Sequence, residues 1–364
     1  MPLIKNSELP TFDRLNNEGW LVLDSERASH QDIREIHIGF LNLMPDAALE
    51  ATERQFFRLI GESNSIAQIH VHPFTLPIFP RGEKAMKHIA DNYETFEKLK
   101  KEGLDALVIT GANEETNPHV SDVSTWGPLK DVLAWAHDNV TSTLCSCLAS
   151  HAALTYSYNQ PPTWRNDKRW GVYRHKVLEP SHPIVKGTNT LFDLPHSRHS
   201  EITRGQFEKA GLRILIESAE AGVHLATSKD GFRLVCFQGH PEYDIFSLLK
   251  EYAREVDNFK TGTRADYPPF PEHYFNDDCA KVASTYKNEV IGGNKSKPFP
   301  ENEILPLLDN TWADSARSIM ANWVGLVYQV TNVDRKKQFM DGVNPNDPLG
   351  IYMGSGADAV SLSA

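Results

Sequence analysis

The sequence is poor in cysteine, and the cysteines it has are unevenly spaced. Only four occur among 364 residues, namely Cys145, Cys147, Cys236 and Cys279. Such a set does not suit the disulfide framework that holds many small secreted proteins together. A chain of this length can also bury a core large enough to fold without covalent cross-links. We therefore expect free thiols and a reducing, cytoplasmic environment.

Long apolar runs and clusters of positive charge are missing as well. The first residues, MPLIKNSELPTF, lack the apolar segment of a signal peptide, and no run of about 18 apolar residues suggests a membrane span. The net charge is −11, and lysine and arginine are scattered along the chain. Nucleic-acid binding needs concentrated positive charge. We expect neither a membrane nor a nucleic acid as partner, which leaves small-molecule chemistry.

What the sequence does contain is an alternation of short β-branched or aliphatic runs with amphipathic stretches. Buried strands are predicted at residues 35–43, 67–74, 105–110, 141–146, 222–227 and 233–238. Helices are predicted at 48–62, at 92–103 with a terminal glycine, and at 128–139 with proline in the first turn. Strands that alternate with helices indicate an α/β fold with a mostly parallel sheet flanked by helices.

Composition suggests how the chain is divided. Residues 1–34 are predicted as an N-terminal arm and residues 35–330 as a single α/β domain. Within that domain, residues 161–203 are rich in proline, histidine and arginine, and are predicted as an insertion that covers the substrate side of the sheet. Residues 331–364 are rich in glycine, aspartate and serine, which favours a flexible tail.

The stretch STLCSCLASHAAL places two cysteines between a predicted strand and a predicted helix. No metal site is expected here, because a C-x-C pair needs further ligands and the other cysteines are single and distant. Cys145 alternates onto the sheet and is interpreted as a buried core residue. Cys147 lies where the strand stops, so the backbone N–H of Leu148 would point at a developing oxyanion and the helix N-terminus would favour a thiolate. Cys147 is therefore the candidate nucleophile.

A nucleophilic thiol needs a base, and the stretch CFQGHPEYD offers one. His240 and Glu242 follow a predicted strand and are separated by one proline. Residues two apart in extended backbone point the same way, so Glu242 would orient the His240 imidazole in a Cys–His–Glu set. A polar turn is the alternative for these residues taken alone. Both the cysteine and the histidine follow strands, and α/β sheets place their sites at the carboxyl ends of strands.

A third loop, VITGANEE, follows the strand predicted at residues 105–110. The flexible Gly111 and the next residue, Ala112, would let backbone N–H groups approach a reacting carbonyl and supply a second oxyanion donor. An ordinary β–α turn is equally compatible with this stretch. If the first interpretation holds, three loops at one edge of the sheet would surround the same reacting carbon.

With these residues in view, the sequence resembles the homoserine O-acyltransferases of the MetA type. The similarity runs from about residue 15 to 330 and includes, in order, LNLMP, ITGA, WGVYRHKVLEPSHPIVKG, PHSRH, AGVHLATSKDGFRLVCFQGHPEYD and NTW. It implies a flavodoxin-like fold similar to the class I glutamine amidotransferases. It also implies that Cys147 accepts an acyl group from acetyl-CoA or succinyl-CoA and passes it to the hydroxyl of L-homoserine, in methionine biosynthesis. No bound cofactor and a homodimer are implied too.

The resemblance assigns further residues to the substrate. Arg254, in EYAREV, matches the arginine that holds the carboxylate of the amino acid, a role suited to a bidentate guanidinium. Lys168 and Ser197 match the other substrate-binding positions of the family. For the lysine in particular, a solvated surface side chain is the alternative, because most lysines are exposed.

The sequence departs from the family pattern after the nucleophile and also in the loop after LNLMP, which reads DAALEATE and lacks the usual paired lysines. After the nucleophile the common pattern is Trp-Gly-Ala-Gln, whereas here it is LASH, so Ala149 adds a methyl group where glycine is usual. The family residue that selects the acyl donor lies four positions past the glycine of TGA, which by straight counting is Glu115. A carboxylate there would repel a succinyl carboxylate, which favours acetyl-CoA. An apparent extra residue before Trp126 makes that counting uncertain, so succinyl-CoA stays open.

Other functions stay open at this point. A class I glutamine amidotransferase uses the same Cys–His–Glu chemistry, although its elbow normally reads Gly-x-Cys-x-Gly and here the flanking residues are Cys145 and Ala149. A catalytically silent member that binds CoA esters or a partner protein is a second alternative. Serine in place of homoserine as the acyl acceptor is a third.

Overall fold

The computed structural model describes residues 3–29, 33–63, 66–77, 80–112 and 126–352, and Glu115 lies outside these ranges. The strands are β1 (Leu3–Lys5), β2 (Val22–Asp24), β3 (Glu35–Leu41), β4 (Gln68–Phe74), β5 (Ala106–Ile109), β6 (Ser142–Ser146), β7 (Thr163–Val177), β8 (Leu191–Glu201), β9 (Arg213–Ser218), β10 (Gly222–Thr227) and β11 (Leu234–Phe237). They form one sheet in the order β2-β1-β4-β3-β5-β6-β11-β10-β9-β7-β8.

The sheet has a parallel part and an antiparallel part. The strands from β2 across to β11 pair in parallel, and those from β11 across to β8 pair antiparallel. The central parallel strands are almost wholly buried, as expected for strands covered by helices on both faces. The predicted α/β class with a mostly parallel sheet is confirmed.

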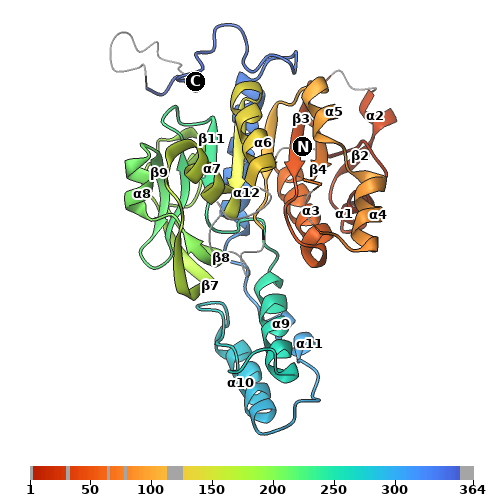
Figure 1. Ribbon diagram of the computed structural model, residues 1–364, viewed down its shortest axis with the longest axis vertical. Coiled ribbons are helices and arrows are strands. Elements are labelled where there is room, and N and C mark those ends of the chain that lie inside the picture. Colours follow the sequence, from red (N-terminus) through yellow and green to blue (C-terminus); the bar gives the residue numbers. More distant parts are fainter. Residues whose placement is uncertain (1–2, 30–32, 64–65, 78–79, 113–125, 353–364) are drawn as a thin grey trace.

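Helices cover both faces of the parallel part (Figure 1). The helices of the described residues are α1 (Pro10–Asn17), α2 (Ser25–Ser29), α3 (Asp46–Gly61), α4 (Glu83–Asn92), α5 (Phe96–Glu102), α6 (Trp126–Asn139), α7 (Leu148–Tyr158), α8 (Arg204–Lys209), α9 (Ser247–Thr261), α10 (Asp277–Ile291), α11 (Glu301–Ile304) and α12 (Ala313–Val330), with short 3₁₀ turns at Pro183–Val185 and Leu305–Leu307. Figure 1 shows α9, α10 and α11 in a lobe that projects from the lower end of the body.

Strand β5 shows how the sequence builds two cores. Its residues alternate between the faces of the sheet: Ala106 and Val108 belong to the apolar cluster of α3 and α12, whereas Leu107 and Ile109 belong to the cluster of α5, α6 and α7. A fully buried aliphatic side chain contributes about 1.5–3 kcal/mol. Packing on both faces therefore fixes the ends of the central strands, where the candidate site lies.

All six predicted strands are present, with boundaries within two residues of those expected. The helix predicted at 92–103 begins only at Phe96 and ends, as expected, on Gly103, which has a φ of 81°. The helix predicted at 48–62 is α3, and the one predicted at 128–139 is α6. The predictions therefore hold best where strand and helix patterns alternate regularly.

Three other segments differ from what the sequence suggested. The expected N-terminal arm contributes β1, which pairs with both β2 and β4 and so belongs to the sheet. Residues 161–203 do not cover the sheet but extend it, because β7 and β8 pair as its outer hairpin. Residues 331–352 of the expected tail pack on the body, where Gln338 Nε2 donates a hydrogen bond to Val140 O at 2.6 Å.

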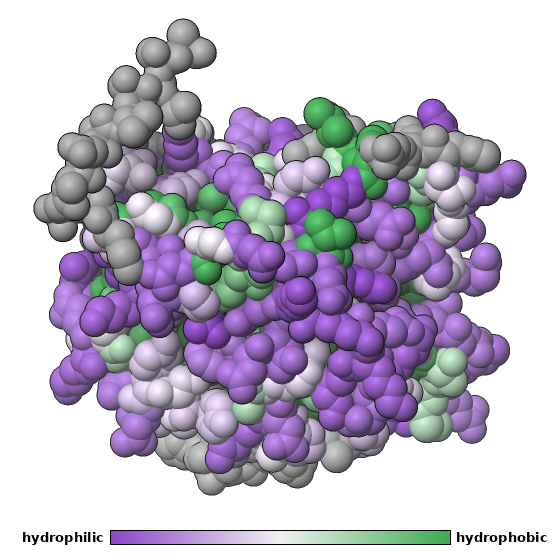
Figure 2. Space-filling view, turned by 90° about the horizontal axis from the view of Figure 1, so that it is seen from above, coloured by the Kyte–Doolittle hydropathy of each residue, from purple (hydrophilic) through white to green (hydrophobic). Residues whose placement is uncertain are grey.

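In the view of Figure 2, hydrophobic residues form small separate patches among hydrophilic ones. Among the described residues, no helix is both long enough and apolar enough to cross a membrane. All four cysteines are free and buried.

Candidate active site

Cys147 occupies a strained elbow between β6 and α7. Its φ of 50° and ψ of −114° lie in a region that residues with a side chain rarely adopt, and such strain costs about 1–3 kcal/mol. The elbow is tied to the neighbouring strand, because Cys147 N–H donates to Phe237 O at 2.7 Å. The side chain is only 3% exposed. The Cys147 side chain is thus held in place at the carboxyl edge of the sheet.

The residues that depart from the family pattern after Cys147 fit into the elbow. Ser150 Oγ lies 2.7 Å from Cys145 O and 3.0 Å from Phe237 O, so its hydroxyl links β6 and β11. Ala149 is fully buried in the apolar cluster of α5, α6 and α7, away from solvent. His151 Nε2 lies 3.2 Å from Gln238 Oε1. The extra methyl group of Ala149 therefore packs in the core.

His240 and Glu242 form the predicted pair. His240 Nδ1 lies 2.8 Å from Glu242 Oε1, and the imidazole stacks on Tyr243, with ring centroids 4.4 Å apart. Two contacts hold the loop: His240 N–H donates to Pro195 O at 2.8 Å, and Arg58 Nη2 donates to Glu242 O at 3.0 Å. The hydrogen bond to the carboxylate fixes the proton on Nδ1 and directs Nε2 to other partners.

Charge at the site favours a protonated His240. Burial alone would lower the pKa of this imidazole, but the Glu242 carboxylate and then the Cys147 side chain outweigh it and raise the pKa to about 10. The Nε2 atom is buried and makes no hydrogen bond of ordinary geometry to the described residues. An imidazolium beside a thiol stabilises the thiolate, which is the nucleophilic form of cysteine.

The predicted oxyanion donors lie on either side of Cys147. A Cβ placed on Gly111 would be 3.3 Å from Cys147 Cβ and 4.0 Å from its Sγ, so this loop touches the nucleophile. Ala112 is half-buried beside it. Leu148 is the first residue of α7, and the first N–H groups of a helix have no partner within it. These residues stay candidates for the stabilisation of negative charge next to Sγ.

Lys168 and Ser197 come together on a carboxylate that the sequence analysis did not identify. Glu251, on α9, accepts hydrogen bonds from Lys168 Nζ at 3.2 Å, Ser197 Oγ at 2.7 Å and Tyr243 Oη at 2.8 Å. Burial would raise the pKa of Glu251, but these partners, Lys168 first, lower it overall. Because Tyr243 also stacks on His240, this charged cluster adjoins the catalytic imidazole.

Arg254 is not brought into this cluster. It lies on α9 three residues after Glu251, yet its side chain is 56% exposed and its ion pair is with Glu255, at 3.9 Å. Glu251 lies in the stretch KEYAREV, but only its contacts with Lys168 and Ser197 mark it as part of the site. The structure therefore joins two of the three predicted substrate-binding residues and leaves the third outside.

Two further groups of residues support the catalytic loop. Asp244 accepts a hydrogen bond from Arg54 Nη1 at 2.7 Å and is also paired with Arg58, which anchors the loop to α3. Gly239 packs against His196, and a Cβ there would lie 2.8 Å from the imidazole. Gly239 is therefore required by close packing, since that distance is too short for real contacts.

Comparison with known proteins decides among the alternatives. The family model described as homoserine O-succinyltransferase matches residues 2–333. The chain belongs to that family. The resemblance inferred from the motifs is confirmed, and family membership makes the protein an acyltransferase. The glutamine amidotransferase and silent-binder alternatives lose their support.

Relatives of the homoserine O-succinyltransferase family match nearly the whole chain. A protein of Methylococcus capsulatus named homoserine O-succinyltransferase is 54% identical over 355 residues, which are 96% of this chain and 100% of the relative. One of the same name from Thiothrix nivea is 56% identical and covers 96% of this chain and 98% of its own.

Solved structures with similar folds are far more distant in sequence. A glutamine amidotransferase from Thermotoga maritima is 10% identical, with a TM-score of 0.41 over 80% of this chain and 97% of its own. Another, from Methylobacillus flagellatus, is 14% identical, with a TM-score of 0.42 over 81% of this chain and 95% of its own. Membership of the homoserine O-succinyltransferase family therefore rests on sequence and not on these structures.

Proposed function

We propose that the protein transfers a succinyl group from succinyl-CoA to the hydroxyl of L-homoserine through a thioester on Cys147. The observation that carries this proposal is the strained Cys147 elbow, with Gly111 against its thiol and the His240–Glu242 pair beside it. The choice of succinyl rests on the family and on the names of its relatives. The earlier preference for acetyl-CoA depended on Glu115, which lies outside the described residues, and it is not carried forward.

In the first half-reaction the Cys147 thiolate attacks the thioester carbon of succinyl-CoA. A bond forms from Sγ to that carbon, and the carbonyl oxygen becomes an oxyanion near the N–H groups of Leu148 and of Gly111 and Ala112. Collapse breaks the bond to the CoA sulfur, which takes the proton from the His240 imidazolium. The enzyme is left as a thioester with a neutral imidazole.

In the second half-reaction homoserine replaces CoA. Neutral His240 takes the proton of the hydroxyl as its oxygen attacks the thioester carbon, and the second collapse breaks the bond to Cys147 Sγ. The products are O-succinylhomoserine and the starting pair of thiolate and imidazolium. Protons balance over the cycle, since the one given to CoA is recovered from homoserine.

The cluster around Glu251 suits the charged end of an amino acid. We infer that the carboxylate of Glu251 binds the ammonium group of homoserine and that Lys168 and Ser197 bind its carboxylate. This places the homoserine hydroxyl near His240, because Tyr243 contacts both Glu251 and His240. Arg254 remains the family's assignment for the carboxylate, and its exposed side chain would have to turn inward for that role.

Donor and acceptor can be tested together in one set of assays. Purified protein is given succinyl-CoA or acetyl-CoA with L-homoserine or L-serine, and the O-acyl product is identified by mass spectrometry. We expect O-succinylhomoserine from the wild type and none from Cys147→Ala. A preference for acetyl-CoA would contradict succinyl-CoA as the donor. A preference for L-serine would contradict L-homoserine as the acceptor. A Cys147→Ala variant that retains activity would contradict the thioester.

A further inference from the structure

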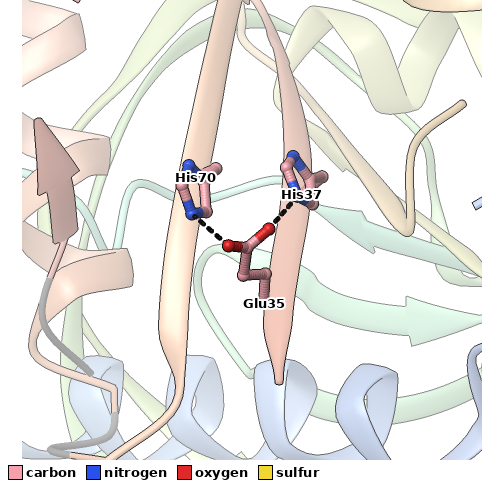
Figure 3. Close-up of side chains that lie close together, drawn as sticks. All are labelled: Glu35, His37 and His70. Atoms are coloured by element: carbon pink, nitrogen blue, oxygen red, sulfur yellow. Dashed lines mark hydrogen bonds and ion pairs between the residues drawn. The ribbon is translucent and has the colours of Figure 1, made fainter. Parts of the chain in front are cut away.

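A second cluster of chemically active side chains lies at the opposite edge of the sheet from Cys147. Glu35 and His37 are on β3 and His70 is on β4, close to where these parallel strands begin, whereas the nucleophile follows the end of β6. Figure 3 shows the Glu35 carboxylate between the two imidazoles, which come from neighbouring strands. Nothing in the acyl transfer uses these three residues.

The strand register explains why the three side chains meet. His37 pairs directly with His70, and Glu35, two residues before His37, projects from the same face. The imidazoles stack with centroids 4.7 Å apart. Glu35 Oε2 lies 3.2 Å from His37 Nε2, and Oε1 lies 3.8 Å from His70 Nε2.

These spacings match those around a tetrahedral metal ion. The three ligand atoms lie within 4.8 Å of one another. Bonds of about 2.0–2.1 Å to nitrogen and oxygen in tetrahedral geometry separate neighbouring ligand atoms by roughly 3.3 Å. Two histidines and one carboxylate are also a donor set found at zinc sites that keep one open position. The two imidazoles are stacked, so their rings would turn apart for both Nε2 lone pairs to reach one ion.

The hydrogen bonds behind His37 leave a lone pair directed at Glu35. The Glu94 carboxylate accepts from Lys98 Nζ at 2.7 Å and lies 2.6 Å from His72 Nδ1. A carboxylate can only accept, so Nδ1 of His72 carries a proton, and in a neutral His72 the Nε2 atom then accepts from His37 Nδ1 at 2.9 Å. The Nε2 atom of His37 then carries no proton and faces a Glu35 carboxylate oxygen, so two hydrogen-bond acceptors lie opposite each other. Histidines that bind metals typically donate their other ring N–H to a neighbouring acceptor in this way.

His70 adds a second unsatisfied nitrogen. Its Nε2 is buried and makes no hydrogen bond to the described residues, and the imidazole is only 14% exposed. A buried polar atom without a partner is costly. A proton between His37 and Glu35 would leave the His70 nitrogen unsatisfied, whereas one metal ion accepts lone pairs from all three groups.

We propose that Glu35, His37 and His70 bind a divalent transition-metal ion, with Zn²⁺ the best match, and that water completes its coordination. The ion would join β3 to β4 far from the thiol, so its effect is on stability and not on acyl transfer. Binding to the folded chain alone raises its stability by mass action.

The positive charge of Arg335 allows a second test of the proposal. The positive charge of Arg335 acts on both His37 and His70. The guanidinium of Arg335 therefore also opposes a bound cation. Its removal is expected to strengthen binding by roughly two- to threefold.

The test uses the full chain, stripped of metal with a chelator, and Zn²⁺ alone as the probe. Equilibrium dialysis and calorimetry measure stoichiometry and affinity, and Co²⁺ absorption reports the geometry. We expect one ion per chain, a binding loss of about tenfold or more in Glu35→Gln and His70→Gln, and tighter binding in Arg335→Gln. Zn²⁺ is also expected to raise the melting temperature of the wild type but not of Glu35→Gln.

Two control variants separate this site from its rivals. Cys147→Ala removes the catalytic thiol, and His273→Gln removes the exposed cluster of Glu220, Glu272 and His273, whose ligand atoms are also close together. Both are expected to bind Zn²⁺ like the wild type. Glu35 is 54% exposed, so Glu35→Gln should fold normally. Absence of binding, loss of binding in either control, or full binding in Glu35→Gln and His70→Gln would overturn the proposal.

Discussion

At the scale of single residues, Glu242 controls the charge of the site. The carboxylate is the chief group that raises the pKa of His240 against the effect of burial. In Glu242→Gln the effect of burial on the pKa of His240 should dominate, so the imidazole becomes neutral. The Cys147 thiolate then loses the positive charge beside it. We expect kcat/KM to fall by about 10²–10⁴-fold. The pH dependence of Cys147 alkylation by iodoacetamide reports the change directly, and an unaltered profile would contradict it.

The same residue predicts how stability depends on pH. Because the folded pKa of His240, about 10, exceeds its ordinary value of 6.5, the protonated imidazole stabilises the fold. This contribution is fully present below pH 6.5 and is lost as the pH rises through about 10. The stability gap between the wild type and Glu242→Gln should therefore narrow from pH 6 to pH 10 in urea unfolding. A gap that widens over this range would contradict the assigned charge.

A substitution of Gly111 tests whether the loop after β5 stabilises the oxyanion. A methyl group there would lie 3.3 Å from Cys147 Cβ, so Gly111→Ala should push the loop away from the thiol with little cost in stability. We expect acyl-enzyme formation to slow by about 10²-fold, the usual cost of one lost oxyanion donor. Gly205→Ala is the matched control, since a Cβ at Gly205 meets no atom within 4 Å. Equal rates in both variants would exclude the loop from the chemistry.

At the scale of elements, Glu251 links α9 to the hairpin of β7 and β8. Glu251→Gln keeps the shape but removes the charge proposed to bind the ammonium group of homoserine. A charged hydrogen bond contributes about 1.5–3 kcal/mol, so KM for homoserine should rise by about 10–100-fold. The rate of acylation by succinyl-CoA should change far less. Glu255→Gln, on the same helix, is the control, and equal effects in the two variants would contradict the assignment.

Sequence patterns predicted some elements well and missed others for physical reasons. Strand β10 was predicted at its observed bounds because it is a short apolar run between turn residues. Strand β7 was missed because its first half is exposed and polar, so it lacks the pattern of a buried strand. Helix α10 follows the proline-rich stretch YPPFP, and no helix was predicted there.

The residues of the candidate site also fall into those that the sequence predicted and those that it missed. Cys147, His240 and Glu242 follow strand ends, where topology alone indicates function, and the resemblance assigned their roles. Glu251 was missed because its importance depends on Lys168 and Ser197, which lie far away in the sequence. The cluster of Glu35, His37 and His70 depends on the register of two strands, which a single sequence does not specify.

At the scale of the whole molecule, the segment after α12 completes the core at the edge of the sheet where β5 begins. Thr331 Oγ1 donates to the buried carboxylate of Asp105 at 3.0 Å, and Arg34 Nη2 donates to Thr331 O at 2.6 Å. Truncation after residue 330 should therefore lower the melting temperature by several degrees, since each buried polar group left unpaired costs about 1–3 kcal/mol. Thermal unfolding of the truncated and full chains checks this, and equal melting temperatures would contradict it. The homodimer implied by the family stays a prediction.

The central claim is that the acyl group passes through Cys147, and the intact mass of the protein tests it most directly. The protein is mixed with succinyl-CoA or acetyl-CoA, with and without L-homoserine, beside Cys147→Ala. We predict a succinyl adduct on the wild type alone, which homoserine removes. No adduct on the wild type, or the same adduct on Cys147→Ala, would contradict the account.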